Sequence, residues 1–441
     1  MEDSTTILFG LPDVAVERVE RGVDGARTVH VVTDDEDAAA CPVCGVFSTS
    51  VRQYRTTRPK DLPYGEAPLA LRWHKVQWRC REAACPRTAF TESIAELPSG
   101  ARVTGRTRRA AGAAVGSGRS VSSVAEEYPI SWAVVHDAFV AHAEELLPEP
   151  APPAVLGIDE TRRGRPRWSR DLATGRWVRS EPFETNFVDL AGEGGLLGQT
   201  AGRTVAAVTG WLEARGEEWK ASVQVVAMDP CATYRRAISD ALPQARIVAD
   251  HFHLVRLANQ TVTAVRQRVT RQTVGRRGRR SDPAWASRRR LLRGRERLSE
   301  AAFTQMWNDL VDAEPTGQLL GAWIAKEELR ALLSTARRGG QRHDIAHRLF
   351  RFYDWCARVD IPEVTTLATT IEAWWPEILG FLQTGITNAG TEGRNRLVKD
   401  AARVAFGFRS LDNQRRRVRF HCTRQSRQAP AGTRAMPPQL R

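Results

Sequence analysis

The pattern of apolar and polar positions changes character along the 441-residue chain. Residues 69–80 (LALRWHKVQWRC) alternate between the two kinds, as a half-buried strand does. Residues 101–147 instead follow a helical period, broken at GSGR and again at PIS, and Ser131 stands where the last helix needs an N-cap. The proline-rich stretch 148–154 is typical of a stiff linker, so we place a domain boundary there.

The helices in residues 101–147 predict a helix-turn-helix. Two helices joined by a three-residue turn match this motif, whose second helix enters the major groove of DNA. The buried stripe of that helix is expected to contain Trp132, Val135, Phe139 and His142. An ordinary helical hairpin is the alternative, but four arginines at the start of the segment favour contact with DNA. They are Arg102, Arg106, Arg108 and Arg109.

Beyond the linker, short apolar runs end in acidic residues. The order of elements is three strands, a helix, a strand, a helix and a strand, which is the order of an RNase H-like mixed α/β sheet. The first and fourth strands are neighbours in that sheet, so Asp159 (AVLGIDE) and Asp229 (VQVVAMDP) are expected side by side at one edge. Two such carboxylates form a hard-oxygen pair suited to Mg²⁺ or Mn²⁺. Either aspartate alone would be explained as a residue that starts a turn, but the pair in this strand order favours a metal site.

A third carboxylate is expected from a later helix, and Glu392 (NAGTEGRNRLVKDAARV) is the best candidate. Polar and basic residues follow it on one helical face, a pattern that suits a site holding metal and the DNA backbone together. They are Asn395 or Arg396, Lys399 and Arg403. A basic C-terminal stretch, expected to contact phosphate, contains Arg415, Arg416, Arg417 and Arg419. Glu160 follows Asp159 directly, but would point to the opposite side of an extended chain.

The charge balance changes the picture further. Lysine and arginine (65) exceed aspartate and glutamate (51) by 14, and the pI is about 10.1. A chain this basic predicts a polyanionic partner, of which double-stranded DNA is the first candidate; a solvated basic surface is the alternative. The sequence has neither a run of about 18 apolar residues nor a signal-peptide pattern at its start. We therefore expect a cytoplasmic protein without a membrane partner.

Four of the seven cysteines fall in two pairs. Cys41 and Cys44 are separated by two residues in CPVCG, and Cys80 and Cys85 by four in CREAAC. Two thiolate pairs on short turns, brought together by a hairpin, predict a tetrahedral zinc site that so small a module needs in order to fold. His74 is an alternative ligand, and four buried reduced cysteines are the structural alternative. An odd total without an export signal argues against disulfides.

Together these motifs resemble the ISL-three-type insertion-sequence transposases, a group of bacterial transposases of the DDE superfamily. The matching pieces span about residues 41–420: both cysteine pairs, GIDE, AMDP, ADHFHLVRLAN, and NAGTEGRNRLVK followed by GFRS. The resemblance implies that Asp159, Asp229 and Glu392 take the three catalytic positions. It also implies a bacterial, nucleoid-associated protein.

The resemblance also accounts for the 163 positions that separate Asp229 from Glu392. Similar transposases carry an all-helical insertion there, and this segment has 13 arginines against two acids between Arg266 and Arg297. The DHFH run resembles a D-x-x-H element, which implies that Asp250 and His253 support the site. The alternative for these two residues is a helix-starting aspartate and a histidine in a structural hydrogen bond.

The expected organisation follows the chain in six parts. They are an N-terminal segment (1–38), a four-cysteine zinc-binding module (39–98), a helix-turn-helix domain (101–148), the first part of the RNase H-like catalytic domain (154–261), a helical insertion (262–383), and the last catalytic helix with the basic C-terminal segment (384–425). The basic segment between Asp159 and the second strand (TRRGRPRWSRDLATGRWVRSEP) is longer than a tight hairpin requires. It is expected to be either a DNA-contacting loop or a disordered one.

These expectations combine into a mechanistic hypothesis. The carboxylates hold two divalent ions about 3.5 to 4 Å apart, which activate the attacking oxygen and stabilise the leaving oxygen without a covalent protein–DNA intermediate. The zinc module and helix-turn-helix bind the terminal repeats, and the need to cut two ends together implies at least a homodimer. Two rivals remain at this stage: a zinc-containing DNA-binding regulator without catalysis, and an RNase H-like nuclease that does not join DNA.

Overall fold

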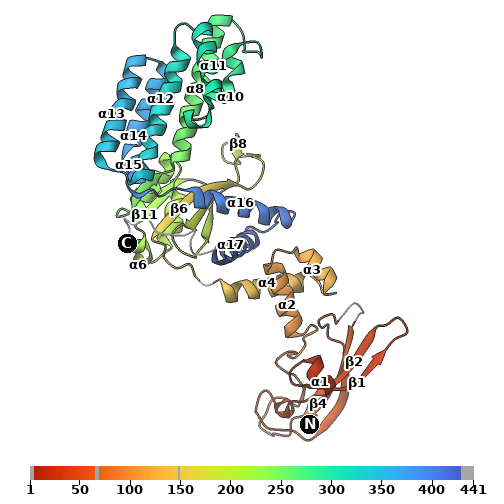
Figure 1. Ribbon diagram of the computed structural model, residues 1–441. Helices are drawn as coiled ribbons and strands as arrows, with labels where there is room; N and C mark the ends of the chain where they lie inside the picture. Colours follow the sequence, from red (N-terminus) through yellow and green to blue (C-terminus); the bar gives the residue numbers. More distant parts are fainter. Residues whose placement is uncertain (1–3, 65–68, 148, 429–441) are drawn as a thin grey trace. The chain divides into compact units, whose positions relative to one another are not determined.

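A computed structural model describes residues 4–64, 69–147 and 149–428 (Figure 1). The chain divides into two compact units, Met1–Glu149 with Asp400–His421 and Pro150–Lys399 with Cys422–Arg441. Among the described residues, no helix combines the length and the apolar character that crossing a membrane requires.

The first unit opens with a five-stranded sheet in the order β1-β2-β4-β3, with β5 paired to β4. Its strands are β1 (Val14–Arg21), β2 (Arg27–Thr33), β3 (Val51–Thr57), β4 (Leu69–Arg79) and β5 (Ala89–Thr91). The alternation predicted over residues 69–80 is therefore the longest strand of the sheet. Its inward side chains Leu71 and Trp73 are buried against Val29 and Val31 of β2. Since β1 and β2 belong to the same sheet as β4, the sheet crosses the boundary expected at residue 38.

Three helices follow, α2 (Gly105–Gly116), α3 (Val121–Glu127) and α4 (Trp132–Leu146). Ser131 accepts a hydrogen bond from the Val134 N–H, so the predicted N-cap is confirmed. The predicted stripe is confirmed for Val135 and Phe139, which are buried, but it is wrong for Trp132, which is 52% exposed. The Trp132 ring lies in the first turn of α4 and packs edge-on against His136, outside the core. The ring of His142 lies 5.4 Å from that of Phe420.

A buried ion pair joins the start of α2 to the loop after β3. The Asp61 carboxylate, with a fully buried side chain, accepts hydrogen bonds from the Arg106 guanidinium and from the Thr104 hydroxyl. Burial opposes ionisation of Asp61, but these hydrogen bonds outweigh it and hold its pKa below the usual range. The backbone pairs there too, because the Lys60 N–H donates to the Arg102 carbonyl.

The second unit is built on a five-stranded sheet in the order β10-β9-β6-β11-β12. The strands are β6 (Val155–Arg162), β9 (Phe183–Asp189), β10 (Leu196–Ala201), β11 (Val225–Met228) and β12 (Arg246–Ala249). β9 is antiparallel to both of its neighbours, whereas β6, β11 and β12 are parallel to one another. The prediction that the first and fourth strands of this region are neighbours is confirmed, since Val225–Met228 pairs with Val155–Ile158.

Both faces of this sheet are covered. On one face Leu156, Ile158 and Met228 pack with α5 (Val205–Glu213) and α7 (Ala232–Ala241) in one hydrophobic core. Between them α6 (Glu217–Ser222) contributes the mostly buried Trp219. On the other face Val155, Val225 and Ala227 belong to a second, larger core. The alternation along β6 and β11 thus assigns successive residues to opposite faces.

The larger core is completed by helices that follow β12. The long ones are α8 (His251–Val274), α11 (Glu300–Ala313), α12 (Gln318–Leu333), α13 (Arg342–Val359), α14 (Pro362–Ala373) and α15 (Trp375–Thr384), and the short ones are α9 (Pro283–Ala286) and α10 (Arg288–Leu291). Every regular element that the structure describes between residues 251 and 384 is helical. Two further helices, α16 (Ala389–Val404) and α17 (Leu411–Gln428), end the described chain, and a separate two-stranded hairpin consists of β7 (Arg167–Arg170) and β8 (Trp177–Ser180).

The Asp61–Arg106 pair gives a stability prediction. Asp61→Asn leaves the Arg106 guanidinium, whose side chain is only 18% exposed, without its counter-charge. We expect the free energy of unfolding of the first unit to fall by about 3 kcal/mol, measured by urea denaturation of the full chain. Asp137→Asn, on the exposed surface of α4, is the control and should change stability by less than about 0.5 kcal/mol. Equal stability of the two variants would contradict the prediction.

Candidate active site and metal centre

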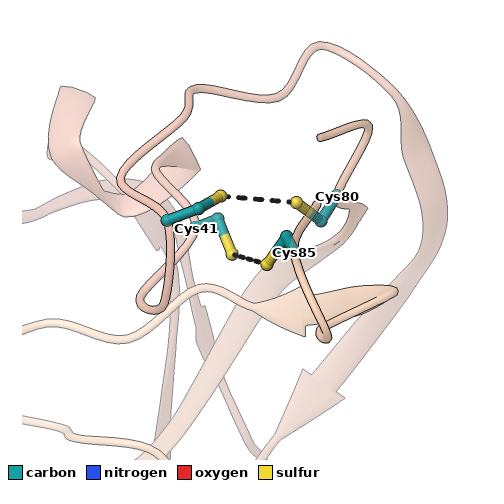
Figure 2. Close-up of side chains that lie close together, drawn as sticks. Cys41, Cys80 and Cys85 are labelled. Atoms are coloured by element: carbon teal, nitrogen blue, oxygen red, sulfur yellow. Dashed lines mark hydrogen bonds between the residues drawn. The ribbon is translucent and has the colours of Figure 1, made fainter. Parts of the chain in front are cut away.

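The four paired cysteines meet in the first unit. The Sγ atoms of Cys41 and Cys85 lie 3.9 Å apart, and those of Cys44 and Cys80 lie 3.6 Å apart. Figure 2 shows the sulfur atoms pointing toward one another from two separate turns. A zinc ion bonded to sulfur at about 2.3 Å sets the edges of its tetrahedron at roughly 3.8 Å, so the observed spacing fits such an ion.

Backbone groups prepare this cluster for a cation. The N–H groups of Cys44 and Val43 point at the Cys41 sulfur and lower the pKa of its thiol to about 6. His74, the alternative ligand, is engaged elsewhere, because its ring contacts His30 (2.8 Å) and Thr56 (3.0 Å). The structure therefore brings together the four cysteines as the possible metal ligands and leaves His74 out of the group.

In the second unit, three carboxylates stand at the same level of the sheet. Met228 at the end of β11 is paired with Ile158 of β6 on one side and with Ala249 of β12 on the other. The residues that follow these three positions are Asp159, Asp229 and Asp250. Parallel strands present their carboxyl ends at one edge, so the three side chains lie beside one another there.

His253 holds two of these carboxylates. It lies in the first turn of α8, three residues after Asp250, which precedes the helix. Its Nε2 is 2.9 Å from an Asp229 oxygen and its Nδ1 is 3.2 Å from an Asp250 oxygen. These hydrogen bonds raise the pKa of His253 to about 10, so the ring is an imidazolium that lies between two negative charges. Asp229, Asp250 and His253 are also close enough together to share one ion.

Two asparagines, one in α16 and one directly before it, contact the same edge of the sheet. Asn388, just before the helix, donates to an Asp229 oxygen (3.4 Å) and to the Ile158 carbonyl (3.1 Å) through its side chain. Asn395, seven residues later, donates to an Asp159 oxygen at 2.5 Å. Its own oxygen accepts from Asn186 of β9 (2.8 Å), which orients the amide group.

Glu392 lies between these asparagines on α16. Positions four and three residues apart occupy one face of a helix, so Glu392 shares the face on which Asn388 and Asn395 contact the aspartates. The side chain is half-buried and is near enough to His251 to influence its titration. Among the described residues, Glu392 makes no hydrogen bond or ion pair with Asp159 or Asp229, so its place in the site rests on this shared helix face.

The charge at this edge is incompletely balanced. Burial, followed by the negative charge of Asp229, raises the pKa of Asp159 to about 7. A carboxyl group in that position favours a neighbouring cation, and oxygen ligands are those that Mg²⁺ and Mn²⁺ prefer. The residues present therefore fit a divalent ion. Glu160 points to the other face, as predicted, where it accepts a hydrogen bond from the Tyr234 hydroxyl (2.9 Å).

The predicted DNA-binding residues differ in exposure. Arg396, Lys399 and Arg403 are exposed on α16. Arg415 and Arg416 on α17 are half-buried, and Arg416 lies 4.0 Å from Glu144. The expectation that the neighbouring Arg417 contacts phosphate is wrong, because this side chain is buried. Its guanidinium donates to the Arg119 carbonyl (2.6 Å) and lies over the Phe139 ring.

Sequence reasoning did not assign Asn388 or Asn186 to the site. Asn388 stands in TNAG, directly before the helix that carries Glu392. A single asparagine at the start of a helix gives no periodic signal that would assign it to a metal site. Asn186 lies inside β9, whose interior residues are buried, and is opposite Asp159 in the pairing with β6. Asparagine is uncommon within strands, and its position in a predicted strand is the signal that could have identified it.

Comparison with known proteins gives consistent matches. The sequence model of a family described as transposase, of the DDE ISL3 type, matches residues 172–418, and one for the zinc-finger of transposase IS204/IS1001/IS1096/IS1165 matches residues 37–85. The transposase for insertion sequence element IS1001 of Bordetella parapertussis is 25% identical over 415 residues, covering 92% of this chain and 94% of the relative. The transposase for insertion sequence element IS1557 of Mycobacterium tuberculosis is 26% identical over 231 residues, covering 49% of this chain and 52% of the relative.

The cysteine cluster predicts a structural zinc site. Cys44→Ser should remove zinc from the purified protein and unfold the small module around it, because a structural zinc site contributes its binding energy to folding. Zinc content is measured by mass spectrometry and folding by the protection of residues 39–98 from hydrogen exchange. Cys231→Ser, at a lone cysteine, is the control and should retain the metal. A Cys44→Ser protein that keeps its zinc would remove Cys44 from the ligand set.

The packing of α16 on β6 gives a second prediction. A Cβ at Gly157 would come within 2.1 Å of the Thr391 Oγ1 and 3.0 Å of Leu190. Gly157→Ala should therefore lower the free energy of unfolding by about 1 to 3 kcal/mol, measured by urea denaturation. A second substitution, Thr391→Ala, should restore part of this loss. Gly210→Ala, where nothing lies within 4 Å, is the control, and a loss of stability as large as that of Gly157→Ala would argue against the contact.

Proposed function

The chain belongs to the ISL3 family of insertion-sequence transposases, and from that premise we propose that it cuts and joins DNA with divalent metal ions held by Asp159, Asp229 and Glu392. The observation that carries this proposal is the level register of β6 and β11, which puts Asp159 and Asp229 at adjoining strand ends. Glu392 completes the set from the helix face that already contacts both aspartates through Asn388 and Asn395.

The proposed fold of the catalytic part is RNase H-like. Its support is the strand order β10-β9-β6-β11-β12, which reads 3-2-1-4-5 along the chain when the hairpin is set aside. The first three strands are antiparallel and the last two are parallel to the first. In this arrangement the helices after β12 form an insertion between the second and third catalytic acids.

The residues of the chain prepare the carboxylates for this reaction. Bound Mg²⁺ or Mn²⁺ ions would activate the attacking oxygen and stabilise the leaving oxygen. His253 fixes the Asp229 carboxylate through a 2.9 Å contact, and Asn395 fixes that of Asp159. Asp250 holds the other nitrogen of His253, so it supports the site indirectly. We assign Asp250 and His253 as positioning residues and the three acids as the metal ligands.

DNA recognition is proposed for the first unit. The cysteine cluster would hold zinc and keep the module folded, while α3 and α4 would act as a helix-turn-helix. A groove of about 540 Å³ supports this placement, since aromatic and basic side chains line it together. They include Trp132, His136, Phe406, Arg409 and Arg416. A mixture of this kind suits both the bases and the phosphates of DNA.

On α16, the exposed Arg396 and Lys399 are proposed to hold the DNA backbone beside the carboxylates. Arg403, Arg415 and Arg416, which belong to the first unit, are also proposed to contact DNA phosphates. Because both ends of an element must be cut together, we propose that the active form is a homodimer or a higher oligomer. Its substrates are the double-stranded ends of the element and the target DNA.

Alanine substitution of the acids tests the proposal. Asp159→Ala, Asp229→Ala and Glu392→Ala should each abolish cleavage and strand transfer, because each removes a metal ligand, while binding of the DNA ends persists. The measurement is a cleavage and strand-transfer assay with Mg²⁺ on DNA that carries the element's ends, beside a gel-shift assay. Glu372→Ala, on the exposed face of α14, is the control and should retain full activity.

Each outcome of that test has a separate meaning. Strand transfer by the Glu392→Ala protein would remove Glu392 from the catalytic set and leave the two aspartates in it. Cleavage without strand transfer by the unaltered protein would favour a nuclease. Full loss of DNA binding together with activity would indicate unfolding, which circular dichroism separates from a catalytic defect.

A further inference from the structure

The segment that leaves β6 after Asp159 forms a hairpin. The pairing of β6 with β9 runs to Arg162 and Phe183, and the Arg163 N–H then donates to the Pro182 carbonyl (2.7 Å). Beyond this neck β7 pairs with β8, so the segment expected to be a DNA-contacting or disordered loop is a regular element. At its tip the Asp171 carboxylate accepts hydrogen bonds from two backbone N–H groups, which fixes the turn.

One face of this hairpin carries two tryptophans and two arginines. Trp168 is paired with Arg179, and Trp177 with Arg170. Directly paired residues, and residues two apart on one strand, point to the same side of a sheet. The indole side chains are therefore diagonal neighbours, and they are 62% (Trp168) and 67% (Trp177) exposed.

The basic surroundings of the two exposed indoles indicate the kind of partner that would bind them. Residues 161–182 contain seven arginines against two acids, so the surroundings of the two rings favour a polyanion. The Arg179 guanidinium forms an ion pair with Glu181 (2.7 Å), and the Arg170 Nε donates to the Gly175 carbonyl. These two contacts hold both arginines close to the hairpin. Among the described residues, neither indole packs against another ring or a cationic group.

We propose that Trp168 and Trp177 form a stacking platform for unpaired bases of the DNA near the cleavage site, an inference that rests on the proposed function. Duplex DNA hides the faces of its bases by stacking them, so only unpaired nucleotides offer a flat surface to an indole. Diagonal neighbours on a hairpin have Cα atoms about 7 to 8 Å apart. Bases repeat about every 3.4 Å along a strand, so one base between two rings needs roughly that separation.

The position of the hairpin ties this platform to the chemistry. The hairpin extends the same strand that carries Asp159, and Trp168 lies only nine positions after Asp159. Such a stretch spans at most about 30 Å of extended chain. Nucleotides displaced from the duplex beside the reacting phosphate are therefore within reach of the platform, whose arginines contact their phosphates.

The test compares two DNA probes bound by the full-length protein. An oligo(dT) single strand offers unpaired bases, and a blunt duplex of equal length offers none; both are titrated in EDTA so that no cleavage occurs. The double variant Trp168→Ala/Trp177→Ala should bind oligo(dT) at least about ten-fold more weakly than the unaltered protein and should keep its duplex affinity. Trp168→Phe/Trp177→Phe should keep most of the affinity for oligo(dT), because a phenyl ring still stacks.

Matched controls lie on the same hairpin. Val178→Ala removes exposed apolar surface from its opposite face, and Leu172→Ala does so at its tip, and neither should change the affinity for oligo(dT). Arg167→Ala should weaken binding of both probes and reduce the dependence of affinity on salt. Circular dichroism confirms that each variant is folded.

Three results would overturn the proposal. The first is unchanged oligo(dT) affinity of the Trp168→Ala/Trp177→Ala protein, and the second is an equal loss for both probes, which would make the face a general DNA-binding surface. The third is a change in sedimentation without a change in either affinity, which would assign the tryptophans to contact between two copies of the chain. Failure of the catalytic assignment is distinguishable, since it would appear as cleavage by the Asp159→Ala protein and leave these affinities unaffected.

Discussion

Repulsion between carboxylates at one edge of a sheet is the constraint on which the catalytic unit depends. Asp159, Asp229 and Asp250 follow three paired positions of parallel strands, so the backbone register alone holds their charges together. Each charge then needs a compensating group. The His253 imidazolium lies between Asp229 and Asp250, whereas the donors to Asp159 among the described residues are an amide and a backbone N–H, and its pKa stays raised. A cation bound at this edge would therefore stabilise the ionised carboxylates.

The rest of the unit keeps this arrangement in place. Hydrophobic cores on both faces fix the level of the strands, and α16 returns across β6 where Gly157 leaves room for Thr391. A larger side chain at position 157 would lift the helix that carries Asn388, Glu392 and Asn395. In the cysteine cluster too, the backbone holds the ligand atoms together: two turns place the four sulfur atoms at distances that suit a tetrahedral site.

Much of this could be predicted from the sequence, where strong periodicity or fixed spacing gave the signal. The strand alternation at residues 69–80, the cap at Ser131 and the adjacency of β6 and β11 follow from local chemistry and strand order. Long-range packing could not be predicted in this way. The helical pattern predicts that Trp132 is a core residue, because the pattern of one helix does not show where a neighbouring helix ends. The basic stretch predicts that Arg417 contacts phosphate, whereas in the structure the side chain is buried beside the Phe139 ring and donates to the Arg119 carbonyl. The roles of Asn388 and Asn186 depend on contacts made across more than a hundred residues.

One contact bears on how such proteins change over evolutionary time. The chain leaves the sheet edge directly after Asp250 and returns at Asn388, whose backbone N–H donates to the Asp250 carboxylate (3.3 Å). The two ends of the intervening helical segment are therefore joined beside the proposed active site. A longer turn in that segment, away from this junction and from the core that the helices share with the sheet, leaves the contact in place and adds little loop-closure entropy. Changes of length in such outer turns are thus separated from the positions of the proposed catalytic acids.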